Sequence, residues 1–237
     1  MKVRWFVLGV VAAVALALPA TVQAQVFYDD FDSYAAGSTI IGQGGWEGWG
    51  GGTSSDATVV DTFSHSSPNS LAVSGPCDLV QTWGGITSGL WYAKAWTYVP
   101  STQTGDMFFI LLNTYDGACA GSTDCNWSVQ VDLCAAGCNN GTPGYVVNLG
   151  GSDVPGTGMA PLITNQWVEL VVEINLDANT YTVYYDGVAF DSQTWTTTGL
   201  QAIQCMDLYS DASSESYMDD AWLDTSIPVS LQSFDVE

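Results

Sequence analysis

The sequence predicts an all-β protein folded as a two-sheet antiparallel jelly-roll sandwich. Short apolar runs separated by turn residues recur along the chain, and no stretch after the first 24 residues shows helical periodicity. The segment 168–176 alternates apolar and polar residues, which places one face of a strand in a core and the other in water. About a dozen such runs within the length of one domain favour a sandwich.

The expected strands are separated by Gly, Pro, Ser or Asn, the residues that most often interrupt β-structure. The segment 177–180 and the pair Asp186-Gly187 are turns that join the later strands into a meander. Residues 42–52 form a long Gly-rich loop. In chain order, strands are expected over 57–63, 70–74, 90–99, 107–115, 127–133, 145–149, 168–176 and 181–185, with a further run over 188–190.

The first 24 residues have the pattern of a secretory signal peptide. Lys2 and Arg4 precede an apolar run over 5–18, and small residues at 22–24 provide a cleavage site. An uncleaved anchor is the alternative, but the run is short for a membrane span. We therefore expect a protein that is secreted, extracellular or at the cell surface, without membrane insertion after cleavage. The β-sandwich domain is expected over 25–226, and 227–237 as a terminal strand or tail.

The charge of the chain excludes several classes of partner. After the signal peptide, Lys94 is the only Lys or Arg, against 25 Asp and Glu in the whole sequence. Such a protein repels nucleic acids and anionic membranes. Carboxylates that lie close together without a basic partner need another cation, and calcium is the hard ion that carboxylate oxygens bind outside the cell.

Six cysteines in an exported chain predict disulfides, although fifteen pairings are open. Cys119 and Cys125 flank one short loop, Cys134 and Cys138 flank another, and Cys77 and Cys205 are left for a long-range bridge. A zinc site made from the middle four is the alternative, which their irregular spacing disfavours.

Several segments resemble the concanavalin A-like lectin/glucanase superfamily, including its laminin-G-like modules. The hairpin over 167–174 and 181–187 resembles the central hairpin of those domains, and the segments 28–34 and 217–222 resemble the paired first and last strands of bacterial jelly rolls. The resemblance implies a structural calcium ion where these two strands meet. The matching ligands are Asp29, Asp30, Asp32, Asp219 and Asp220. The alternative is that these aspartates point to solvent on edge strands.

Aromatic residues suggest where a ligand would bind. Trp46 and Trp49 lie in the Gly-rich loop, where an exposed indole can stack on a sugar ring, and Glu47 and Gln43 can hydrogen-bond its hydroxyls. The alternative is that the loop folds both rings back over the sandwich. The strand tryptophans, Trp127 among them, are expected in the core, and Asp207 and Asp211 in solvated loops.

Catalytic groups are not evident in the sequence. The Glu-x-Asp-x-x-Glu pattern of related glucanases is absent, and Glu169 and Glu173 are about 13 Å apart along one strand, too far for glycoside hydrolysis. His65 and Lys94 are the only bases after the signal peptide. We therefore expect a non-catalytic, lectin-like module that binds a polysaccharide or surface glycan. The alternative is a structural or adhesive protein that self-assembles through strand edges into a surface layer or filament.

Overall fold

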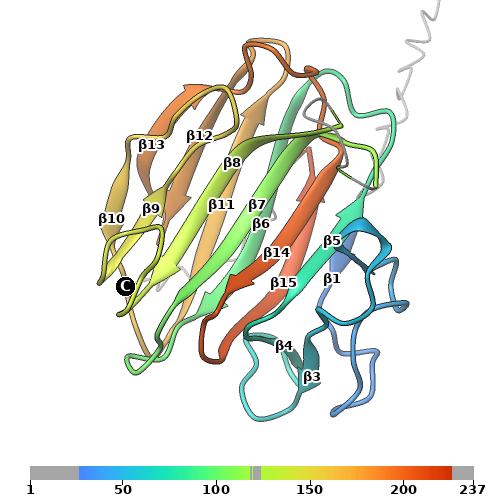
Figure 1. The fold of residues 1–237 in the computed structure, drawn as a ribbon, viewed down its shortest axis with the longest axis vertical. Helices are drawn as coiled ribbons and strands as arrows, with labels where there is room; N and C mark the ends of the chain where they lie inside the picture. The colour runs from blue at the N-terminus through green and yellow to red at the C-terminus, as the bar shows by residue number, and fades with distance from the viewer. Residues whose placement is uncertain (1–26, 118, 120–123, 226–237) are drawn as a thin grey trace, which may run out of the picture.

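Two antiparallel β-sheets stacked face to face form the fold in the computed structural model, which describes residues 27–117, 119 and 124–225 (Figure 1). In Figure 1, three strands of one sheet overlap three strands of the other: β7 (Asp106–Tyr115), β8 (Cys125–Cys134) and β14 (Cys205–Asp211) belong to the first, and β6 (Leu90–Tyr98), β11 (Trp167–Asn175) and β15 (Ser216–Asp224) to the second. The predicted jelly-roll sandwich is confirmed. The predicted signal peptide, 1–24, and tail, 227–237, lie outside the described residues.

Sheet A contains eight strands, with the meander predicted from the turn residues at one edge. Asp186 and Gly187, both with positive φ, form the tight turn of its second hairpin. The first and last strands pair, with Asp29 opposite Ala221. The order is β13 (Val188–Thr194), β12 (Thr180–Tyr185), β11 (Trp167–Asn175), β6 (Leu90–Tyr98), β15 (Ser216–Asp224), β4 (Ser70–Val73) and β3 (Thr58–Val60), and β1 (Phe27–Asp29) also pairs with β15.

Sheet B contains seven strands and carries a second apolar cluster on its outer face. Its order is β10 (Met159–Pro161), β9 (Tyr145–Asn148), β8 (Cys125–Cys134), β7 (Asp106–Tyr115), β14 (Cys205–Asp211), β5 (Asp78–Thr82) and β2 (Glu47–Gly48). A short 3₁₀ turn, η1 (Trp49–Gly51), follows β2. No helix among the described residues is both long enough and apolar enough to cross a membrane.

The main core lies between the sheets and is built by the alternation of each strand. From sheet B, Phe109, Leu111 and Leu208 point inward, and they meet Leu170 and Val172 of sheet A. All five side chains are buried. Because alternate residues point to opposite faces, their neighbours on β7 and β14 are on the outer face of sheet B.

Two of the three predicted disulfides are present. Cys119 pairs with Cys125 and Cys134 with Cys138, whereas Cys77 and Cys205 are free buried thiols. The predicted Cys77–Cys205 bridge is wrong because of strand register: Cys205 is opposite Thr82 on β5, so Cys77 lies beyond the other end of that strand. The two thiols also belong to different clusters, Cys77 to the main core and Cys205 to the outer face of sheet B.

Candidate functional site

The outer face of sheet B carries a second apolar cluster that is separate from the main core. Val80, Ile110 and Leu112 form its buried base. Aromatic side chains that are only partly buried pack on this base: Trp49, Tyr115, Trp127 and Tyr209. A sheet face of this kind combines a rigid apolar floor with rings that solvent can reach.

Trp49 and Trp127 lie side by side on this face. Their rings are nearly parallel, with an interplanar angle of 13° and centroids 5.8 Å apart, and the Tyr115 ring is 5.0 Å from that of Trp49. The backbone N–H of Gly50 donates to the Tyr115 hydroxyl at 3.1 Å, which ties η1 to the end of β7. The two indoles therefore form a fixed, partly exposed aromatic platform.

A pocket of about 380 Å³ lies beside this platform and is lined by Trp49, Asp78, Ile110, Cys119, Trp127, Gln130, Asp207 and Tyr209. A second pocket of about 370 Å³ shares Asp78 and Tyr209 with the first and extends to Asp211 and Ala212. Because they share two residues, the two pockets are adjacent, over β5 and β14. We call the two pockets together the sheet B groove.

Asp78 and Asp207 form a carboxyl pair in the groove. Tyr209 is opposite Asp78, and Asp207 is opposite Val80, so the two aspartates are diagonal neighbours on adjacent strands and hydrogen-bond to each other. Burial and the nearby Asp78 charge raise the pKa of Asp207 well above its usual range, and burial raises the pKa of Asp78 to about 6. Asp207 therefore holds its proton more tightly than Asp78 and is the donor of the pair, with Asp78 the acceptor.

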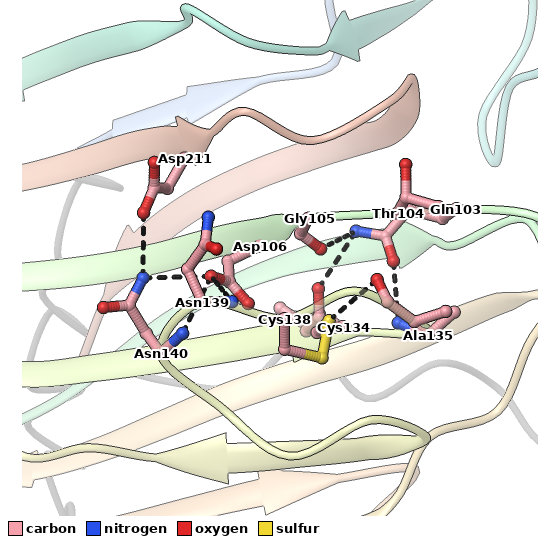
Figure 2. Close-up of a disulfide and its surroundings, with 12 residues drawn as sticks. Gln103, Thr104, Gly105, Asp106, Cys134, Ala135, Cys138, Asn139, Asn140 and Asp211 are labelled. Carbon is pink, nitrogen blue, oxygen red and sulfur yellow. Dashed lines mark hydrogen bonds between the residues drawn. A yellow bond between two sulfur atoms is a disulfide. The ribbon is translucent and has the colours of Figure 1, made fainter.

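A second carboxyl pair, Asp106 and Asp132, lies on β7 and β8. Figure 2 shows Asp106 enclosed by the loop that follows the Cys134–Cys138 disulfide: its Oδ2 accepts the backbone N–H groups of Asn139 and Asn140, at 2.8 and 3.0 Å, and the Asn140 side chain, at 2.9 Å. Burial and the Asp106 charge raise the pKa of Asp132 to about 8. The loop thus stabilises a charge on Asp106, and Asp132 keeps its proton at neutral pH.

The groove lacks a nearby positive charge. Among the described residues, the side chains that can carry one are Lys94 and His65, and neither lines the groove. Lys94, on β6 of sheet A, pairs with Glu169 at 2.7 Å and lies 4.8 Å from the centre of the Trp222 ring. His65 contacts Asp220 of sheet A at 2.6 Å and stacks on Trp96. The groove therefore combines aromatic faces with carboxyl groups, and none of its lining residues is a base that could neutralise an anionic ligand.

The predicted ligand residues of the Gly-rich loop are not all at this site. Trp46 is fully buried, and its Nε1 donates to Asp29 at 2.8 Å, so its predicted role as an exposed platform is wrong. Gln43 donates to Thr39 and Ser38 within the loop. Glu47 is exposed opposite Val80, on the face of the groove, and Trp49 lines the groove itself.

β1, which carries Asp29, pairs with β15, which carries Asp219 and Asp220. The five predicted calcium ligands are not among the groups of three or more described side chains whose ligand atoms lie within 4.8 Å of one another. Protein donors already contact these carboxylates. Asp29 accepts from Phe31, Tyr34 and Trp46, and Asp219 from His65, Ser66 and Asp220. Asp220 accepts from Tyr28, and Asp30 and Asp32 each accept a backbone N–H group. A calcium ion at this junction would share these carboxylate oxygens with the protein donors, and its binding stays a prediction.

Three groove residues were not singled out from the sequence. Trp127 was expected in the core and is instead half-buried on the outer face, because β8 runs irregularly against the end of β7. Asp207 was expected in a solvated loop but lies in β14, and Asp78 begins β5. The pattern of β14 could have predicted a strand here, because apolar Met206 and Leu208 alternate with Asp207 and Tyr209.

Comparison with known proteins identifies the fold of the chain. No family model and no curated protein matches the sequence. Among solved structures, the chain is similar to an endo-β-1,4-glucuronan lyase from the fungus Trichoderma reesei, with a TM-score of 0.54, 11% identity and coverage of 86% of this chain and 96% of the lyase. It is similar to a sialidase with a TM-score of 0.53 and 10% identity over 86% of this chain and 18% of that protein. A carbohydrate-binding module, CBM66 from Bacillus subtilis, matches with a TM-score of 0.47, 12% identity and coverage of 76% and 95%.

These comparisons correct the prediction that the chain is not an enzyme. That prediction depended on finding no known catalytic pattern in a lectin-like fold. The same sandwich occurs in a lyase and in a sialidase, so the fold does not argue against catalysis. The Asp78–Asp207 pair in the groove is a further reason to test for it.

Proposed function

We propose that the chain binds a polysaccharide along the sheet B groove. The observation that carries the proposal is the pair of parallel, partly exposed indoles of Trp49 and Trp127 on the wall of a pocket that also contains two carboxyls. Sugar rings have apolar faces that stack on indoles and hydroxyls that hydrogen-bond to carboxyl and amide groups. The pocket beside Trp49 and Trp127 offers indole faces together with carboxyl and amide groups.

The polar groups of the groove suit sugar hydroxyls. Asp78 accepts hydrogen bonds at neutral pH. The side-chain amide of Gln130 is oriented by its bond to the Gly150 carbonyl, at 3.0 Å, and lies on the same wall. Ligand pockets usually combine a predominantly apolar lining with a few positioned polar groups of this kind.

The proposal includes the setting predicted from the sequence. We place the chain among bacterial, secreted proteins of the concanavalin A-like type, and the lyase and sialidase folds support a role on glycans.

Calcium at the β1–β15 junction is a separate proposal. A melting temperature that rises with calcium and falls with a chelator supports it, and an unchanged melting temperature removes it.

The test is binding of the whole chain to a panel of soluble polysaccharides, measured by affinity electrophoresis and calorimetry. We expect Trp49→Ala and Trp127→Ala each to weaken binding at least tenfold, because truncating an aromatic side chain that anchors a ligand typically costs about 2 kcal/mol or more. Trp167→Ala is the matched control, since Trp167 is also half-buried but lies on sheet A. Undiminished binding by both groove variants would refute the proposal. The same samples are assayed for new reducing ends and unsaturated products, which report catalysis.

Assembly through sheet edges is a second candidate function. Val188 on edge strand β13 is 66% exposed, and Met159 on edge strand β10 is 52% exposed, so each sheet carries an exposed apolar side chain at its edge. Such edges can add a strand from a neighbouring molecule. Light scattering across a concentration series tests this: polymers abolished by Val188→Lys favour assembly, and a constant monomer mass excludes it.

A further inference from the structure

Cys119 forms part of the wall of the pocket beside Trp49 and Trp127. Its side chain is partly exposed and packs against the outer apolar cluster of sheet B. Every other residue that lines this pocket belongs to a strand of sheet B or to η1, whereas Cys119 lies in the connection between β7 and β8. Cys119 therefore needs another contact to hold it in the pocket wall.

The Cys119–Cys125 disulfide supplies that contact. Cys125 begins β8, is opposite Tyr115 on β7 and is buried in the outer apolar cluster, and Trp127 follows it on the same strand. The backbone N–H of Cys119 donates to Asp116 at 2.8 Å, a contact within the same connection. The φ angle of Cys119 is +47°, in the left-handed region that few residues other than glycine adopt. The disulfide thus ties Cys119, in an uncommon conformation, to the strand that carries one indole of the platform.

Reduction of this disulfide releases one part of the pocket wall. A dithiol reductant breaks the S–S bond, each sulfur gains one electron and one proton, and the dithiol is oxidised to its own disulfide. Cys119 then regains backbone freedom. Because Cys119 lines the pocket, a ligand that fills the pocket must fix it again, and fixing the backbone of one residue lowers affinity by roughly tenfold.

The second disulfide provides an internal comparison. Cys134 is at the opposite end of β8 from Cys125, and neither Cys134 nor Cys138 lines a pocket of the sheet B groove. The loop that follows this disulfide is also held by three hydrogen bonds to Asp106, as Figure 2 shows. Its reduction should therefore leave the pocket beside Trp49 unchanged.

We infer that the Cys119–Cys125 disulfide is part of the glycan site and that its reduction weakens glycan binding. The inference rests on the proposed function and adds a redox dependence to it. Coupling between two equilibria is reciprocal. A glycan that binds the oxidised protein more tightly therefore makes this one disulfide harder to reduce, by the same factor.

The first experiment measures binding by calorimetry at pH 7 with three neutral β-1,4-linked hexasaccharides, made of glucose, xylose or mannose. We expect the double variant Cys119→Ser/Cys125→Ser to bind the tightest of them about tenfold more weakly than the natural protein. The matched variant Cys134→Ser/Cys138→Ser should bind it as tightly as the natural protein. Circular dichroism confirms that each variant is folded.

The second experiment is a redox titration of the natural protein, which decides the question even where a variant does not fold. The protein is equilibrated with mixtures of reduced and oxidised dithiothreitol, with and without a saturating concentration of the same hexasaccharide. Free thiols are trapped by alkylation and located by peptide mass mapping. The hexasaccharide should raise the ratio of reduced to oxidised dithiothreitol that is needed to reduce Cys119–Cys125 about tenfold, and should leave the ratio for Cys134–Cys138 unchanged.

The outcomes separate this inference from the proposed function. If both disulfides become equally harder to reduce, the ligand protects the whole fold and the inference is wrong. If neither does, while the hexasaccharide binds and Trp127→Ala abolishes that binding, the disulfide is outside the site; the inference is wrong and the groove still binds glycans. If no hexasaccharide binds the folded natural protein, both proposals fail.

Discussion

Replacing Asp132 by asparagine should make the stability of the protein less sensitive to a rise in pH between about 4 and 8. Asp132 is fully buried on β8, and burial together with the Asp106 charge raises its pKa from 3.8 to about 8. The folded protein therefore keeps a proton that the unfolded chain releases above pH 3.8. The resulting stabilisation is complete below about pH 3.8 and is lost as pH rises through about 8.

The size of the effect follows from the proton linkage. Within this window, one retained proton changes the free energy of unfolding by about 1.4 kcal/mol per pH unit, or about 2.7 kcal/mol between pH 5 and pH 7. The asparagine side chain carries no charge, and its amide can donate to Asp106 as the protonated Asp132 does. The stability of Asp132→Asn relative to the natural protein should therefore rise by about 2–3 kcal/mol from pH 5 to pH 7.

Urea unfolding followed by tryptophan fluorescence at pH 5, 6, 7 and 8 measures this difference. Asp186→Asn is the control, since its exposed side chain is on the turn between β12 and β13. The control should shift stability equally at every pH. Parallel pH profiles for Asp132→Asn and the natural protein would refute the reasoning, because they would mean that Asp132 is ionised in the fold.

Three further predictions concern Trp46, the cysteines and Asp153. Trp46→Phe should lower the free energy of unfolding by about 2 kcal/mol through loss of its bond to Asp29, and should leave glycan affinity unchanged; weakened binding in calorimetry would contradict its placement in the core. Alkylation of the unreduced, denatured protein should label Cys77 and Cys205 alone by mass spectrometry, and any other labelled cysteine would refute the pairing. Asp153 accepts three threonine hydroxyls and two backbone N–H groups, and these bonds lower its pKa to about 2. The stabilisation by charged Asp153 is present above pH 3.8 and is lost as pH falls through about 2, so Asp153→Ala should lower the melting temperature more at pH 5 than at pH 2. An equal loss at both pH values would count against this reasoning.

Much of the fold could be predicted from the sequence because its longer strands follow regular patterns. The segment 168–176 alternates as a half-buried strand should and forms most of β11, and Asp186-Gly187 forms the expected hairpin turn. β5 and β14 were missed. Their outward positions include Asp78, Asp207 and Asp211, and aspartate is rare in strands. Asp207 can occupy a strand because burial beside Asp78 raises its pKa and so favours its uncharged form. This contact with the neighbouring strand is not visible in the sequence pattern.

The site was predicted only in part, for a related reason. Trp46 and Trp49 are three residues apart in one Gly-rich loop and gave the same signal. Gly44 and Gly45 have positive φ and turn the chain so that Trp46 enters the core; β2 then pairs with β5, and Trp49 emerges on the outer face of sheet B. Trp127, its partner in the platform, is 78 residues away, so only strand pairing brings the rings together.

Tryptophan indole N–H resonances, recorded while the tightest-binding hexasaccharide is titrated into ¹⁵N-labelled protein, test the sheet B groove most directly. The Trp49 and Trp127 signals, assigned through single Phe substitutions, should move in proportion to saturation, while those of buried Trp46 and Trp195 stay fixed. Shifts confined to Trp96, Trp167 and Trp222 would place the ligand on sheet A and contradict the assignment of the groove.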